Sequence, residues 1–277
     1  MKYNRYYWEA FDGKELFAQS WETENKPRGV ILLVHGIGDH GGRYAEWAKL
    51  FTEKDFSVLA MDYRGHGLSG GKKGHAKSLE AIFKDIDVMI QNSNHLFPGV
   101  KRVLYGHSMG GNIVINYFLS RYFRIDALII TSPWLRLVKE PSPLTLMAAK
   151  LVKKIAPSLT FNTGIHANQL STDIEKADEA RKDELLHHKI SAKLYFEATL
   201  GAERALANVF KINVPILCMH GTGDKITSPK ACEDFVMNTS NKTHYKNWDV
   251  NSHELHHDPK RHEIFNFVVE WLKKYNI

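Results

Sequence analysis

The chain has 277 residues, of which 43% are hydrophobic and 25% charged, and its formal net charge is +6. This length and apolar content allow one substantial core, so a single domain over residues 1–277 is expected. No apolar run reaches the roughly 18 residues of a membrane-spanning helix. The positive charge is mild and its lysines are spread along the chain, which argues against nucleic acid as a partner.

The N-terminal segment and the cysteines indicate a cytoplasmic protein. Residues 1–9, MKYNRYYWE, are aromatic and charged and lack the apolar centre of a signal peptide. The two cysteines are Cys218, in an expected strand, and Cys232, in an expected helix. Both are typical core positions in a protein of a reducing compartment. The sequence leaves the oligomeric state open.

Strand-like and helix-like segments alternate over most of the chain. Strands are expected near residues 3–11, 14–22, 29–35, 57–62, 101–107, 126–131, 214–220 and 243–248. Helices are expected near residues 44–54, 78–93, 109–122, 229–238 and 260–275. This alternation predicts parallel βαβ units preceded by antiparallel strands. The expected α/β fold is therefore a mostly parallel eight-stranded sheet with helices on both faces.

A glycine-rich loop follows the apolar run at residues 30–34. Its sequence, HGIGDHGGRY over residues 35–44, allows a backbone N–H to point at a developing alkoxide, and Ile37 is the candidate donor. The glycine spacing matches neither G-x-G-x-x-G nor a Walker loop, and no Lys-Ser or Lys-Thr follows. A nucleotide site is therefore not expected.

The motif G-x-S-x-G occurs at residues 106–110, between an apolar strand and a helical pattern. Such a motif makes a sharp strand-to-helix turn that exposes the serine hydroxyl, and glycines flank it because a Cβ would clash with the backbone. Ser108 is therefore the candidate nucleophile, and the N–H of Met109 is the candidate second oxyanion donor. An ordinary loop serine is the alternative.

The interval between the strands at 126–131 and 214–220 is about eighty residues long, far more than a crossover needs. An insertion from about residue 133 to 203 is predicted to cap Ser108. Its clearest helix carries an apolar stripe of Leu144, Met147, Leu151 and Ile155, with lysines opposite. By default such a stripe is expected to pack onto the core. The functional alternative is that it lines an acyl-chain tunnel or touches lipid, which would allow peripheral membrane contact.

A serine nucleophile needs a base and an acid that orients it. The strand at 214–220 leads into HGTGDKITSP, where Asp224 lies in a loop on the same rim as Ser108. Asp224 could instead cap the helix that begins at Pro229, but Ser228 is better placed for that role. Asp224 is therefore the candidate acid.

The segment NSHELHHD places His253 in the loop between the last strand and the last helix, where a base is needed. His256 and His257 lie closer to the helix start and are expected to be solvated or to cap it. The same segment satisfies the zinc motif H-E-x-x-H, which needs a stable helix. Because Pro259 disfavours a helix here, a metal is not expected.

Five strings, HGIGDHGGRY, DYRGHGLSGG, GHSMGG, HGTGDKITSP and SHELHHD, fall in this order between residues 35 and 258. Together they resemble the monoacylglycerol lipase and lysophospholipase group of the α/β-hydrolases. The resemblance implies the nucleophile Ser108, the acid Asp224 and the base His253. It also implies that Ile37 and Met109 are the oxyanion donors.

The resemblance has one departure, at the polar end of the expected substrate pocket. Asp39 stands where the group usually has glutamate, which bears on recognition of a glycerol head group. Together with Arg43 and His107, Asp39 is expected to contact the substrate.

The leading hypothesis is a serine hydrolase that cleaves lipid-like monoesters, either monoacylglycerols or lysophospholipids, through an acyl-enzyme and without a cofactor. A second hypothesis keeps the fold and the triad but makes the protein a peptidase, thioesterase or acyltransferase. A third, a non-catalytic binding scaffold, would have no reason to retain all three triad positions.

Overall fold

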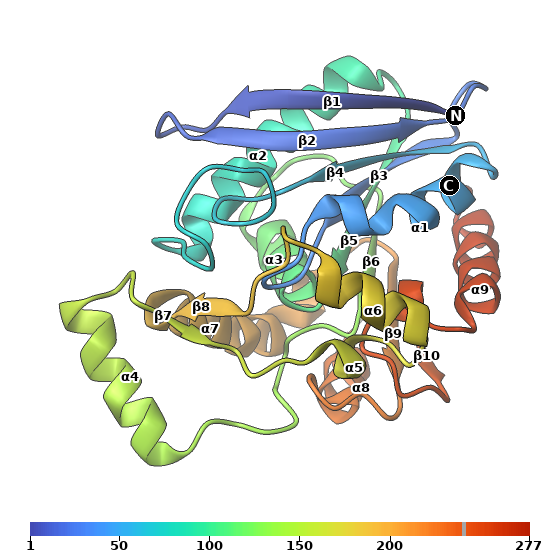
Figure 1. Cartoon of the computed structure of the whole chain (residues 1–277). Helices are drawn as coiled ribbons and strands as arrows, with labels where there is room; N and C mark the ends of the chain where they lie inside the picture. The colour runs from blue at the N-terminus through green and yellow to red at the C-terminus, as the bar shows by residue number, and fades with distance from the viewer. Residues whose placement is uncertain (240–241) are drawn as a thin grey trace.

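The computed structural model describes residues 1–239 and 242–277, and within them the main sheet has eight strands (Figure 1). The strand order is β1-β2-β4-β3-β5-β6-β9-β10. Only the pairs β1–β2 and β2–β4 are antiparallel, and every other pair is parallel. The expected sheet with antiparallel leading strands is confirmed.

The strands lie within two residues of their predicted bounds. They are β1 (Lys2–Glu9), β2 (Glu15–Glu22), β3 (Gly29–Val34), β4 (Phe56–Met61), β5 (Lys101–His107), β6 (Ala127–Thr131), β9 (Ile216–Gly221) and β10 (Thr243–Trp248). Every residue of β3, β4 and β9 is buried, as expected for strands covered on both faces.

Helices cover both faces of the sheet. One apolar core joins the sheet to α2 (Leu79–Leu96), α3 (Met109–Ser120) and α8 (Pro229–Met237). A second core, on the other face, joins it to α1 (Ala45–Thr52) and α9 (Arg261–Lys274). Ser228 caps α8 by accepting from the N–H of Ala231, with Pro229 as the first helical residue. Asp224 is thus not needed as a cap, as the sequence predicted.

The long interval after β6 holds several short elements. They are α4 (Pro143–Ile155), β7 (Thr160–Asn162), α5 (Ala167–Leu170), α6 (Ile174–Lys182), β8 (Lys189–Ser191) and α7 (Ala192–Asn208). Helix α7 continues past residue 203, the expected end of the insertion, and packs against α3. The side-chain amide of Asn112 donates to the carbonyl of Ala198 at 2.8 Å, and that of Asn116 donates to Gly201 at 2.8 Å. The second half of α7 is thus part of the helical layer on the sheet.

Helix α4 lies at the edge of the molecule and contains no buried residue (Figure 1). The stripe residues are exposed: Leu144 is 71% exposed, Met147 64%, Leu151 59% and Ile155 74%. The opposite side faces the protein, because the Lys153 ammonium lies 4.7 Å from the ring centre of Phe196 on α7. The expectation that this stripe packs onto the core is therefore wrong. Among the described residues, no helix is long and apolar enough to cross a bilayer.

Candidate active site

Ser108 lies in a strained turn between β5 and α3. Its φ is 54° and its ψ is −120°, a backbone conformation that residues with a Cβ rarely adopt. Glycines surround it for steric reasons, since a Cβ on Gly106 would lie 2.5 Å from the carbonyl oxygen of Gly110. A Cβ on Gly110 would collide with the carbonyl oxygen of Val34. This backbone geometry is the sharp strand-to-helix turn that the G-x-S-x-G motif predicts. The side chain of Ser108 lines the pocket but is only 5% exposed.

Asp224 is a buried carboxylate with a full set of partners. Its Oδ2 lies 2.6 Å from Nδ1 of His253 and 3.0 Å from Nε2 of His220, and it accepts from the Thr227 hydroxyl at 3.0 Å. Its Oδ1 accepts from the N–H of Ile226 at 2.7 Å. Burial alone would raise the pKa of Asp224, but the charge of His253 and these hydrogen bonds hold it well below its usual value. Asp224 is therefore ionised at neutral pH.

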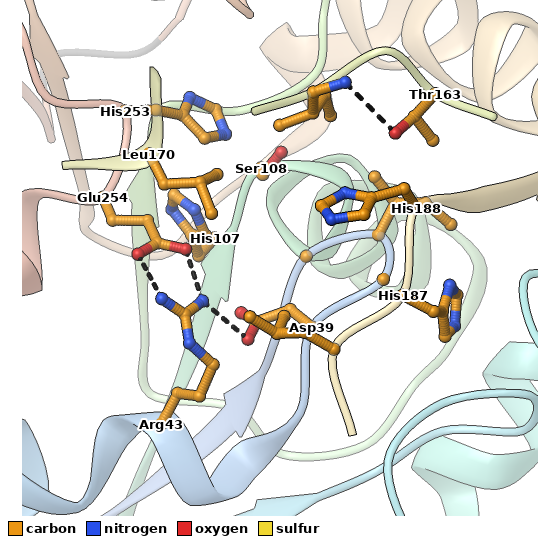
Figure 2. Close-up of a pocket in the computed structure, with 15 residues that line it drawn as sticks. Asp39, Arg43, His107, Ser108, Thr163, Leu170, His187, His188, His253 and Glu254 are labelled. Atoms are coloured by element: carbon orange, nitrogen blue, oxygen red, sulfur yellow. Dashed lines mark hydrogen bonds and ion pairs between the residues drawn. The ribbon is translucent and has the colours of Figure 1, made fainter. Parts of the chain in front are cut away.

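His253 lies beside this carboxylate. It also lines the same pocket as Ser108 (Figure 2). Burial alone would lower the pKa of His253, but the charge of Asp224 and its hydrogen bond outweigh burial and raise it. Because Nδ1 is bound to Asp224, Nε2 is the ring nitrogen left free to act as a base. The three residues predicted as a triad are thus brought together from β5, β9 and the loop after β10.

The two predicted oxyanion donors are both near Ser108, since Ile37 lines the same pocket and Met109 directly follows Ser108 in the chain. Among the described residues, the N–H groups of Ile37 and Met109 donate to no other protein group. The loop that carries Ile37 is fixed by its neighbours, because the Tyr63 hydroxyl donates to the carbonyl of Gly36 at 2.9 Å. The N–H of His187, in the insertion, donates to the carbonyl of Gly38 at 2.9 Å. Two free N–H groups on a fixed backbone are what an oxyanion hole requires.

Asp39 and Arg43 line the pocket but are bound mainly to protein groups (Figure 2). Arg43 donates from Nη1 and Nη2 to both carboxylate oxygens of Glu254, at 2.5 and 2.7 Å. Its Nη1 also donates to Asp39 at 3.1 Å, and the hydroxyl of Tyr44 donates to the second oxygen of Asp39 at 3.0 Å. Sequence reasoning missed Glu254, whose partner Arg43 lies 211 positions away.

His107 lies beside His253. Its ring centre is 4.8 Å from that of His253, and its Nδ1 lies 3.1 Å from the Thr131 hydroxyl. Burial, followed by the nearby charge of His253, lowers the pKa of His107 to about 3. His107 is therefore neutral at the pocket wall and can serve as a polar contact without competing as a base.

His256 and His257 are buried, with exposed fractions of 1% and 5%, which corrects the expectation that they are solvated. Residues Leu255–His257 form a short 3-10 helix rather than the α-helix that a zinc motif needs. His257 Nε2 donates to the carbonyl of Arg43 at 2.9 Å, and its Nδ1 lies 2.8 Å from Glu254. With a guanidinium beside Glu254 and both nitrogens of His257 engaged, the cluster Glu254, His256 and His257 does not suit a cation.

The structure does not bring the α4 stripe to this pocket. The apolar side chains that line it are Ile37, Ile165, Leu170 and Leu186. Three of these come from the insertion, from segments that the sequence analysis did not single out. Because they lie in loops and in the one-turn helix α5, no periodic pattern marks them.

A serine at a strand–turn–helix elbow, with a paired aspartate and histidine after later strands, defines the serine enzymes of the α/β-hydrolase class. The family model described as "Serine aminopeptidase, S33" matches residues 25–260. Human monoglyceride lipase is 30% identical over 226 residues, which cover 79% of this chain and 73% of the human protein.

Two further proteins are similar to this chain over most of its length. The crystal structure of the Paleococcus ferrophilus monoacylglycerol lipase superposes with a TM-score of 0.85 and 32% identity, covering 94% of this chain and 99% of that one. An uncharacterized abhydrolase domain-containing protein of Dictyostelium discoideum is 32% identical over 267 residues, but the chain spans only 28% of its length. The chain therefore belongs to the S33 family, in the monoacylglycerol lipase group of the α/β-hydrolases, and is a carboxylic ester hydrolase.

Proposed function

We propose that the chain hydrolyses single-chain lipid esters, monoacylglycerols or lysophospholipids, through an acyl-enzyme on Ser108. The observation that carries this proposal is the 2.6 Å contact between Asp224 and His253, beside the pocket that His253 and Ser108 line. The likeness to human monoglyceride lipase and to the Paleococcus ferrophilus enzyme supports the lipid part of the proposal.

The first half-reaction forms the acyl-enzyme. His253 Nε2 takes the hydroxyl proton as Ser108 Oγ bonds to the ester carbonyl carbon, and the carbonyl oxygen becomes an oxyanion. The N–H groups of Ile37 and Met109 donate to this oxyanion. When the tetrahedral intermediate collapses, the carbon–oxygen bond to the alcohol breaks and His253 returns its proton to the leaving alcohol. Asp224 stabilises the imidazolium throughout.

The second half-reaction releases the fatty acid. Water attacks the acyl-enzyme while His253 accepts one of its protons, and the same two N–H groups hold the second oxyanion. Collapse breaks the bond to Ser108, which recovers its proton from His253. The products are one alcohol and one carboxylic acid for each water consumed.

The substrate contacts belong to the same proposal. His107 and the pocket side of Asp39 and Arg43 contact the alcohol part of the substrate. The part of the insertion before α7 acts as a cap, and its apolar side chains Ile165, Leu170 and Leu186 contact the acyl chain, since these line the pocket.

Helix α4 is proposed to contact a lipid surface rather than the bound acyl chain. Its stripe of Leu144, Met147, Leu151 and Ile155 faces solvent, and Lys150 and Lys154 of the same helix are also exposed. An exposed apolar face beside cationic side chains is the pattern of a helix that lies in a membrane interface. Such contact would deliver water-insoluble esters to the pocket.

The family description also names a peptidase, which the same triad could serve. An aminopeptidase needs a carboxylate free to bind the amino group of its substrate. The two carboxylates that line this pocket, Asp39 and Glu254, are already paired with Arg43. This pairing favours the ester over the peptide.

A substrate panel tests the proposed function. We expect p-nitrophenyl esters to be cleaved with a kcat/KM that rises from acetate to medium chains, because each buried methylene adds about 0.8 kcal/mol. Monoacylglycerols and lysophospholipids should be cleaved faster than triacylglycerols, and aminoacyl p-nitroanilides should be left intact. A preference for acetate, or for the anilides over every ester, would contradict the proposal.

A further inference from the structure

Two loops of the active site are joined by one buried ion pair. Glu254 directly follows the base His253, and Arg43 lies just after the loop that carries Ile37. Arg43 and Glu254 make a two-pronged contact at 2.5 and 2.7 Å, with side chains only 7% and 2% exposed. We propose that Arg43 and Glu254 are positioning residues. They hold the loop that carries His253 (the histidine loop) against the loop that carries Ile37 (the oxyanion loop), and they determine the charge next to His253. This inference rests on the proposed function.

The two loops are joined by backbone as well as side-chain contacts. The carbonyl of Arg43 accepts a hydrogen bond from Nε2 of His257, so the histidine loop also binds the main chain at the end of the oxyanion loop. On the other side, Asp39 accepts from Nη1 of Arg43 and from the N–H of His40 at 2.8 Å. One guanidinium therefore fixes a carboxylate in each loop at once.

The same groups act on His253 through their charge. Burial would lower the pKa of His253, whereas the charges of Asp224, Glu254 and Asp39 all raise it. The other titratable side chains near this ring are His107, in ring contact with it, and His257 and Arg43 beside Glu254. His220 acts from the far side of Asp224. Removing a carboxylate and removing the guanidinium should therefore shift the titration of His253 in opposite directions.

The chain offers a matched control for a purely structural role. Arg64 donates from Nε and Nη2 to both carboxylate oxygens of Asp85, at 2.7 and 2.6 Å. This pair is as buried as the first, with side chains 3% and 0% exposed, yet neither residue lines the pocket of Ser108. Breaking it therefore measures the stability that is lost when a buried bidentate ion pair is disrupted outside the pocket of Ser108.

The experiment measures kcat, KM and the pH profile of kcat/KM with p-nitrophenyl butyrate for Glu254→Gln, Arg43→Met and Asp85→Asn. Glu254→Gln should lower kcat about tenfold with KM changed less than twofold. The acid limb of its kcat/KM profile, where activity rises as His253 loses its proton, should move to lower pH by about one unit. Arg43→Met should lower kcat and move the same limb up. Asp85→Asn should lower the midpoint of unfolding but leave the acid limb in place.

Two outcomes would overturn the inference. One is an acid limb that stays in place in Glu254→Gln. The other is a limb that moves the same way in Asp85→Asn. If Arg43→Met does not fold, the isosteric Glu254→Gln still decides. Failure of the proposed function would be seen in a different experiment. It would appear as ester turnover by a folded Ser108→Ala protein, independently of the pH profile of the Glu254 and Arg43 variants.

Discussion

The pocket of Ser108 and helix α4 differ in nearly every physical respect, although both were singled out in the sequence. In the pocket, Asp224 and Glu254 are at most 5% exposed and are held by several hydrogen bonds each. In α4, no residue is buried, and Leu144 and Ile155 are more than 70% exposed. The buried polar contacts fix the geometry that the proposed hydrolysis needs with any ester. The open apolar face of α4 is the surface proposed to contact an aggregated lipid substrate.

The largest expected effect breaks the pocket side of this comparison. His253→Ala should lower kcat/KM by about four to six orders of magnitude on water-soluble and lipid-dispersed esters alike, because Ser108 then has no base. His256→Ala should lose far less, since neither ring nitrogen of His256 has a hydrogen-bond partner among the described residues. Ester hydrolysis assayed with and without EDTA completes the test. Inactivation by EDTA, or equal losses in the two variants, would show that the assignment of His253 is wrong.

The next effect isolates α4. Leu151→Lys should reduce binding to phosphatidylcholine–phosphatidylglycerol vesicles about tenfold, because it removes one large apolar side chain from the interface. Monoolein hydrolysis on those vesicles should fall with it, while p-nitrophenyl butyrate turnover stays constant. Thr145→Lys, which adds the same charge to an exposed position beside the stripe, is the matched control. Equal vesicle binding by wild type and Leu151→Lys would remove the membrane role of α4.

The smallest effect concerns the buried histidines near the site. Burial lowers the pKa of His35, His66, His107 and His256, so all four are neutral in the folded protein. An unfolded histidine binds a proton near pH 6.5, so each one costs stability as pH falls below that value. His253, with its raised pKa, acts in the opposite direction but is outnumbered.

Urea unfolding at pH 7 and pH 5 measures this pH dependence. The free energy of unfolding should fall on acidification, by up to about 1.4 kcal/mol per pH unit for each such histidine. His256→Phe should flatten the slope, whereas the α4 variants should leave it as in wild type. A stability that rises from pH 7 to pH 5 would contradict the account.

Most of the fold could be predicted from the sequence, because most elements depend on residues at their own positions in the chain. The apolar run of β3 indicates a buried strand at its own position, and the glycines around Ser108 permit the sharp turn at theirs. Helix α7 was missed as part of the main helical layer, because its contact depends on the amides of Asn112 and Asn116 on a distant helix. A polar residue inside an apolar pattern does not reveal which carbonyl it will reach.

The sequence was least informative where one element covers another. The stripe of Leu144, Met147, Leu151 and Ile155 showed which side chains share a face, and α4 has that face. Periodicity does not say whether protein, ligand or solvent covers it. Glu254 was missed for a related reason, since its role depends on Arg43, far away in the chain.

The most direct test of the central claim is covalent labelling with a fluorophosphonate, which reacts with an activated serine hydroxyl. Wild type should gain one adduct, located at Ser108 by peptide mass spectrometry, and should lose ester turnover in step with labelling. Ser108→Ala should keep the unfolding midpoint of wild type but take up no label and lose turnover by several orders of magnitude. A folded Ser108→Ala protein that still hydrolyses esters, or an adduct at another serine, would contradict the account.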